Sequence, residues 1–253
     1  MATYDVLLTL STHHSNSAAI RFLNSLHYLG DGDRVLPILV APEAQELADI
    51  ANACPSVPAV YIQSNMNSLH WGRAWGFVWA VNNGITARYL CSCDDDLLWR
   101  EESQYMIPRL DQANSQIGFS LMGFSSTHPI FPQNYDRVED NFLVGFSWLD
   151  GNCIFSNWND NLQYGVLDAP PTPPLVFFVE TEYAYRFRLL TGRPILFDNS
   201  HPYFYEHIFR SDPAINAERA VLSMPGIIAG NRFWLDKFGI EGVDFQGRPG
   251  MHN

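Results

Sequence analysis

The sequence predicts an α/β fold in which a mostly parallel central sheet carries helices on both faces. Strand-like and helix-like segments alternate through the first half of the chain, and repeated β-α-β units of this length imply parallel strands. The chain has 253 residues, of which 47% are apolar, so it can bury a substantial core. No internal repeat and no long linker divides it, and we expect a single domain over residues 1–253.

Each segment of the first half has a local signal of its own. Residues 5–10 (DVLLTL) are a short β-prone run that ends in polar residues, and residues 15–29 place apolar side chains at helical spacing. Gly84 follows the third helical segment, where glycine is favoured as a carboxyl-terminal cap. The expected strands are 5–10, 34–40, 59–63 and 87–93, and the expected helices are 15–29, 42–53 and 68–83.

The second half is less regular, and we expect it to be a smaller, mixed part of the same domain. Residues 142–155 (FLVGFSWLDGNCIF) indicate two strands joined as a hairpin near Asp150, Gly151 and Asn152. Four prolines within residues 169–174 predict an irregular loop. Further helices are expected at 101–113 and 178–190, and further strands at 117–123 and 194–198.

The composition argues against several classes of protein. A net charge of −12 and a pI near 4.9 leave no basic face for a nucleic acid. The amino terminus lacks the pattern of a signal peptide, and no apolar stretch is long enough to cross a bilayer. Cys54, Cys91, Cys93 and Cys153 show no zinc-binding spacing, so we expect free, buried thiols and a cytoplasmic protein.

Three consecutive aspartates, Asp94, Asp95 and Asp96, follow the strand expected at 87–93. Carboxylates this close repel one another, and a divalent cation would reverse that repulsion. Oxygen ligands favour Mg²⁺ or Mn²⁺ over Zn²⁺, and such ions commonly hold phosphates, which suggests a nucleotide-linked substrate. Residues 11–13 fall at the same edge of the sheet, where open parallel sheets bind ligands. The alternative is an acidic turn that caps the next helix.

Four segments, in their order along the chain, carry a family resemblance. They are the amino-terminal strand with its polar turn, residues 67–76 (NSLHWGRAWG), the strand that runs into Asp94-Asp95-Asp96-Leu97, and residues 179–186 (VETEYAYR) followed by Arg188 and Gly192. Together they resemble the GT-A glycosyltransferases, especially the inverting family 2. The second segment is similar to that family's Asn-x-Gly-x-x-x-Ala-Arg-Asn-x-Gly helix, the third to its DXD motif, and the fourth to its Glu-Asp-x-Asp-Leu-x-x-Arg helix start.

The resemblance implies a GT-A-like three-layer sandwich and a metal-dependent, inverting glycosyltransferase of the hexosyltransferase type. Residues 1–100 would bind a nucleotide-sugar donor, a UDP- or GDP-sugar, and residues 101–253 would bind a glycan or another hydroxyl acceptor. The implied cofactor is Mn²⁺ or Mg²⁺. The chain departs from the family at residues 40–43, where no aspartate ends the second strand, and at Val179, which replaces the first acid of the catalytic pair.

The resemblance also implies roles for the acidic triplet. Asp94 and Asp96 would ligate the metal, with Asp94 also contacting the nucleotide, and Asp95 would support the pocket by hydrogen bonding. A histidine from the carboxyl-terminal region completes metal coordination in some members of the fold. His201, just past the strand expected at 194–198, is the preferred candidate, and His207 is the other.

Glu180 is the expected general base, which takes the proton of the acceptor hydroxyl. Glu182 is the second candidate, and both could instead complement the dipole of the helix that they begin.

Arg73 could contact a phosphate or the base through its planar guanidinium, or it could be a surface arginine of an amphipathic helix. Thr9, Ser11 and Thr12 could donate hydrogen bonds to the nucleotide, or they could be turn formers.

Three other functions fit parts of the pattern, two of them enzymatic and one non-enzymatic. A sugar-nucleotidyltransferase shares the open sheet and the carboxylate–metal chemistry, but it would need a glycine-rich, basic phosphate loop after the first strand, and residues 11–14 (STHH) contain no glycine. A haloacid-dehalogenase-like phosphatase would need its Asp-x-Asp after the first strand. A carbohydrate-binding protein that kept the fold without turnover is the non-enzymatic alternative.

Overall fold

The computed structural model describes most of the chain up to residue 207 and a few short stretches near its C terminus. The described residues are 3–12, 16–30, 34–64, 69–126, 137–145, 153–166, 179–200, 202–207, 228–229, 232–233 and 235–237. The helices are α1 (Asn16–Ser25), α2 (Ala44–Ala53), α3 (Leu69–Asn82), α4 (Met106–Gln116), α5 (Trp158–Tyr164) and α6 (Val179–Thr191), with 3₁₀ turns η1 (Leu26–Tyr28) and η2 (Glu101–Tyr105).

Eleven strands are described, nine of them in one large sheet. They are β1 (Thr3–Ser11), β2 (Val35–Ala41), β3 (Val60–Gln63), β4 (Thr86–Cys93), β5 (Leu97–Trp99), β6 (Leu121–Phe124), β7 (Arg137–Glu139), β8 (Phe142–Gly145), β9 (Cys153–Asn157), β10 (Ile195–Asp198) and β11 (Tyr205–His207). The large sheet has the order β3-β2-β1-β4-β9-β6-β10-β8-β7, and β5 pairs with β11 in a separate two-stranded sheet.

The large sheet is mostly parallel, as the sequence predicts. β3, β2, β1 and β4 are all parallel neighbours. β9 enters between β4 and β6 and runs antiparallel to both, and β8 runs antiparallel to β10 and β7. Seven of the nine strands of this sheet therefore share one direction, and β8 and β9 oppose it.

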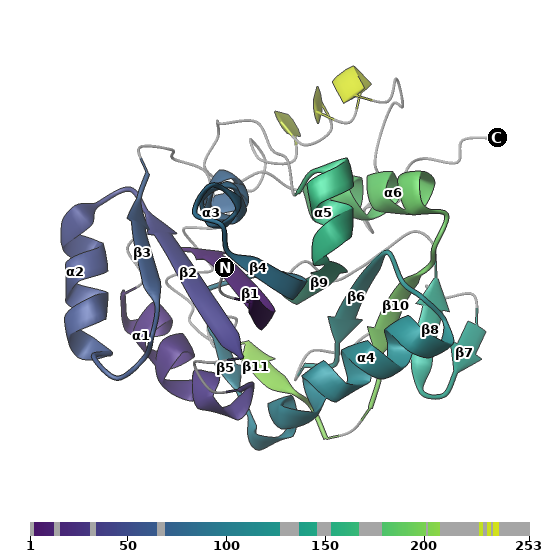
Figure 1. The fold of residues 1–253 in the computed structure, drawn as a ribbon, viewed down its shortest axis with the longest axis horizontal. Coiled ribbons are helices and arrows are strands. Elements are labelled where there is room, and N and C mark those ends of the chain that lie inside the picture. The colour runs from purple at the N-terminus through teal and green to yellow at the C-terminus, as the bar shows by residue number, and fades with distance from the viewer. Residues whose placement is uncertain are drawn as a thin grey trace.

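Helices cover both faces of this sheet and make a three-layer α/β sandwich (Figure 1). The core on one face joins side chains of α1, α2 and α4 to the sheet. The cores on the other face join α3, α5 and α6 to it. In β1, for example, Val6 and Leu8 belong to the first core and Leu7 to the opposite one, as expected where both faces of a strand are buried.

α3 approaches the sheet closely because it has two glycines on its buried face. A Cβ added at Gly72 would overlap the hydroxyl of Ser11 and lie 3.0 Å from its Cβ. A Cβ at Gly76 would lie 3.2 Å from a methyl carbon of Thr9 and 3.3 Å from one of Ile38. α3 therefore lies against the carboxyl-terminal part of β1, with no room for a larger residue at Gly72 and a tight fit for one at Gly76.

One expected connection is wrong. The two strands predicted within residues 142–155 exist as β8 and β9, but they do not pair with each other as a hairpin. β8 pairs with β10 and β7, while β9 pairs with β4 and β6 in the middle of the sheet. Both strands are buried over nearly their whole length, and an apolar run of this kind carries no information about its partner.

The hairpin that does form lies between β7 and β8. Glu139 pairs with Phe142, which leaves a two-residue loop of Asp140 and Asn141 with φ values of 46° and 70°. Two consecutive positive φ angles are typical of the type I′ turn that suits the twist of a hairpin.

The helix-ending glycine and the buried cysteines agree with the sequence, while several short elements do not follow from it. Gly84 has a φ of 67°, as expected of a helix-ending glycine, and the four cysteines are buried free thiols. β5, β7, β11 and α5 are not among the predicted elements. The proline-rich loop at 169–174 lies outside the described residues. Among the residues that the structure describes, no helix is long and apolar enough to span a bilayer.

Candidate functional site

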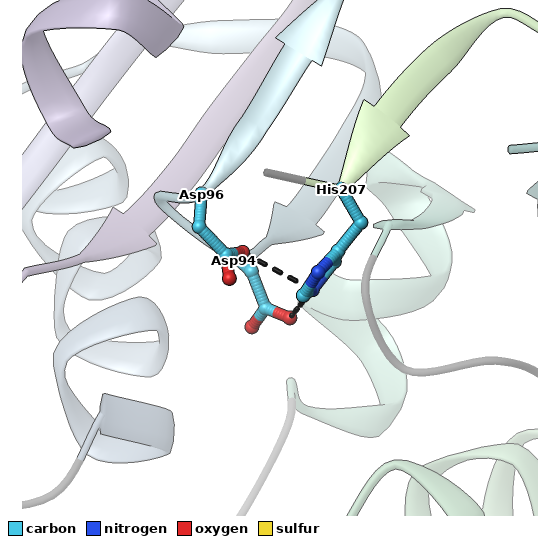
Figure 2. Close-up of side chains that lie close together, drawn as sticks. All are labelled: Asp94, Asp96 and His207. Carbon is cyan, nitrogen blue, oxygen red and sulfur yellow. Dashed lines mark ion pairs between the residues drawn. The ribbon is translucent and has the colours of Figure 1, made fainter. Parts of the chain in front are cut away.

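The acidic triplet forms the turn between β4 and β5. Pairing of β5 with β11 places His207 opposite Leu97, the residue that follows Asp96. The His207 Nε2 atom lies 3.2 Å from Asp96 Oδ1 and 3.6 Å from Asp94 Oδ2. Figure 2 shows the three side chains directed toward one another. Each offers one ligand atom within 4.8 Å of the other two, so a single metal ion could contact all three.

The donor set of this group fits a divalent cation. Asp96 is 1% exposed, and a carboxylate so deeply buried requires compensating positive charge. Asp94 is 28% exposed and gives the group an open side toward solvent. Two carboxylates with one imidazole suit Mn²⁺ better than Mg²⁺, because Mg²⁺ takes oxygen ligands.

Arg73 links this group to a second one. It projects from α3, is 3% exposed, and its Nη2 donates a hydrogen bond to Asp94 Oδ1. Its Nη1 lies 3.9 Å from Glu180 Oε1. Burial alone would lower the pKa of Arg73, but the adjacent carboxylates of Asp94 and Glu180 raise it above its ordinary value, and the guanidinium stays charged.

Glu180 reaches the site from the first turn of α6. Its side chain is 18% exposed, and its Oε1 atom lies 3.4 Å from the Nδ1 of His70. Because Arg73 contacts both Glu180 and Asp94, the expected base and the candidate metal ligands belong to one site. Glu180 also lies in the first turn of α6, where a negative charge interacts favourably with the helix dipole.

Glu182 lies in a different environment. Its side chain is fully buried, and its Oε1 lies 2.9 Å from Arg186 Nε and 2.8 Å from Lys237 Nζ. Arg186 belongs to α6 itself, and Lys237 belongs to the short stretch at 235–237, so Glu182 links these two segments. The structure thus separates the two glutamates that the sequence left as alternatives, and only Glu180 contacts Arg73.

The polar residues at the end of β1 are buried. Thr9 is 1% exposed, donates a hydrogen bond to the Cys91 carbonyl at 3.4 Å, and packs under Gly76. Ser11 is 5% exposed beneath α3, and Thr12 is 1% exposed. In this structure Thr9 and Ser11 therefore serve the contact between β1 and α3.

Asp95 and three histidines, His201, His207 and His70, are the remaining residues that bear on the site. Asp95 is half-buried between the two candidate ligands. His201 lies outside the described residues, and His207, the second candidate, is the histidine found beside Asp94 and Asp96. The sequence carries one signal for His70, its position three residues before Arg73, which places both on one face of a helix.

Comparisons with known proteins add little to this geometry. No family model matches the chain, and no curated protein matches it. Mannose-1-phosphate geranyltransferase from Thermus thermophilus aligns over 65% of this chain and 53% of its own, with 13% identity and a TM-score of 0.38. This chain thus spans about half the length of that enzyme.

A second solved structure aligns over a larger part of the chain. CMP:2-keto-3-deoxy-manno-octonic acid synthetase, complexed with CTP, covers 89% of this chain and is itself fully covered, with 7% identity and a TM-score of 0.48. Neither similarity is high enough to transfer an activity. The α/β fold rests on the strand order and the layers described above.

Proposed function

We propose that this protein is a metal-dependent, inverting glycosyltransferase that moves a sugar from a nucleotide-sugar to an acceptor hydroxyl. The observation that supports the proposal is one buried arginine, Arg73, with a candidate metal site on one side and the partly exposed carboxylate of Glu180 on the other. A donor diphosphate and an acceptor hydroxyl need these two kinds of group within one site.

Asp94, Asp96 and His207 would hold the cation, preferably Mn²⁺. When bound, it would neutralise the charge that develops on the departing nucleoside diphosphate. Arg73 adds a fixed positive charge beside Asp94, and its guanidinium carries more donors than Asp94 occupies.

Glu180 has the role of general base. The acceptor oxygen forms a bond to the anomeric carbon while the bond from that carbon to the phosphate oxygen breaks. The proton of the hydroxyl passes to Glu180, and the nucleoside diphosphate leaves with the bonding electrons. A direct displacement of this kind inverts the anomeric configuration.

The proposal is tested with purified protein and a panel of UDP- and GDP-sugars in Mn²⁺, in Mg²⁺ and in EDTA. We expect release of the nucleoside diphosphate that depends on the metal. Glu180→Gln should lower transfer by about 10²–10⁴-fold, the usual contribution of a general base. Glu101→Gln, on the exposed start of η2, is the matched control and should behave as wild type.

Two outcomes would support the alternatives instead. Formation of a nucleotide-sugar from a nucleoside triphosphate and a sugar phosphate, with pyrophosphate as the product, would indicate a sugar-nucleotidyltransferase. Sugar binding that needs no metal and leads to no turnover would indicate a carbohydrate-binding protein.

A further inference from the structure

His70 is a buried, polar side chain of the site that the reaction described above does not use. It is 5% exposed and lies on α3, one helical turn before Arg73. Its Nδ1 atom lies 3.4 Å from Oε1 of Glu180, and the Nη1 atom of Arg73 lies 3.9 Å from the same oxygen. Two nitrogen-bearing side chains from one helix thus converge on a single carboxylate oxygen.

The helix that presents these two side chains is firmly held. Gly72 lies between them in the sequence and faces Ser11, and Gly76 faces Thr9, so α3 lies close against β1. Residues three apart lie on the same side of a helix. His70 and Arg73 therefore reach Glu180 from one side of a helix that is packed against the sheet, and such packing favours a precisely placed catalytic group.

The approach of His70 and Arg73 distinguishes the two oxygens of the Glu180 carboxylate. Both α3 contacts go to Oε1, on a side chain that keeps 18% of its surface exposed. The nitrogens of His70 and Arg73 lie 3.4 and 3.9 Å from Oε1, so the proposed reaction would use the other oxygen, Oε2, as the proton acceptor. We infer that His70 is a positioning residue, which fixes the Glu180 carboxylate so that Oε2 meets the acceptor hydroxyl. This inference rests on the proposed function.

The test compares two substitutions in the full chain. His70→Phe keeps a planar ring and removes both nitrogens, while His70→Asn keeps a side-chain nitrogen at about the distance of Nδ1 from the backbone. We expect His70→Phe to lower kcat about 10²-fold, the usual effect of misplacing a reacting group, with the donor KM changed less than about twofold because the donor contacts lie elsewhere. His70→Asn should recover most of the lost kcat.

His27→Phe, on the exposed turn η1, is the matched control and should leave both constants unchanged. Wild-type kcat in His70→Phe would overturn the inference. Equal loss in His70→Phe and His70→Asn would overturn it as well, because it would indicate a packing role that any substitution disturbs.

A second measurement needs no turnover and separates this inference from the proposed function. Thermal unfolding midpoints are compared for His70→Phe, Glu180→Gln and the double variant. Residues in contact give non-additive shifts, so the double variant should shift less than the two single shifts combined. Additive shifts of the unfolding midpoint would contradict a contact between His70 and Glu180. Absence of any transfer by the wild type would overturn the proposed function, and the positioning role of His70 with it.

Discussion

Arg73 contributes a permanent positive charge to a site that is rich in carboxylates. Around it lie the carboxylates of Asp94, Asp96 and Glu180 and the imidazoles of His70 and His207. One permanent cation, Arg73, serves three carboxylates, so these groups carry excess negative charge without a metal. A divalent ion would bring them close to neutrality.

This charge balance predicts the effect of metal on stability. Mn²⁺ should raise the unfolding midpoint of the wild type, by the equivalent of about 2.7 kcal/mol at a concentration about 100 times the dissociation constant. EDTA should reverse the gain. Asp96→Asn removes one ligand charge, so it should abolish the gain without lowering the midpoint measured in EDTA. Differential scanning fluorimetry measures the unfolding midpoints of the wild type and of Asp96→Asn, with Mn²⁺ and with EDTA.

Asp49→Asn, an exposed carboxylate on α2, is the control and should keep the full response to Mn²⁺. A response of wild-type size in Asp96→Asn would place the metal elsewhere.

Among the secondary-structure elements, α3 has the largest influence on the site. It carries His70 and Arg73, and its two glycines set its distance from β1 and β2. The acidic turn follows β4, the parallel neighbour of β1. Arg73 and Asp94 therefore meet because a helix and a strand end are held at a fixed separation.

Gly72→Ala tests this separation. The added methyl group would overlap the Ser11 hydroxyl, and we expect a loss of about 1–3 kcal/mol in the free energy of unfolding, as for other overpacked cores. Gly76→Ala should cost less, because its nearest contacts are 3.2 and 3.3 Å. Urea denaturation measures both values.

Ser11→Ala in the Gly72→Ala background should restore part of the loss, since it removes the overlapping oxygen and leaves the 3.0 Å approach to Cβ. No loss in Gly72→Ala, or no recovery in the double variant, would mean that α3 is free to shift.

For the whole molecule, the contact of Lys237 with Glu182 joins the short stretch at 235–237 to α6. Lys237 is the only lysine of the chain. Lys237→Met would leave the fully buried carboxylate of Glu182 paired with Arg186 on its own helix, and we expect a loss of about 1–3 kcal/mol in unfolding free energy.

The matched control for this change is Arg232→Met. Arg232 pairs with Asp236 at the surface, with exposures of 71% and 59%, and such pairs contribute little. Equal effects of the two substitutions on the urea midpoint would contradict a structural role for the Lys237 contact.

The fold of the first half could be predicted because each of its helices connects strands that are parallel in the same part of the sheet. The acidic turn could be predicted for the same reason, since it directly follows β4. The position of β9 could not, because its neighbours β4 and β6 are set by packing between distant segments. His207 was only a second candidate, because β5 and β11 are three-residue strands with no readable period.

The central place of β9 has a consequence for the order in which the chain can fold. Until residues 153–157 have left the ribosome, one hydrogen-bonding edge of β4 has no partner in the nascent chain, and β6 lacks both β9 and β10. Exposed apolar edges of this kind favour association between molecules. Slow translation of the middle third, or its truncation, should therefore promote aggregation, although the first four strands can already assemble.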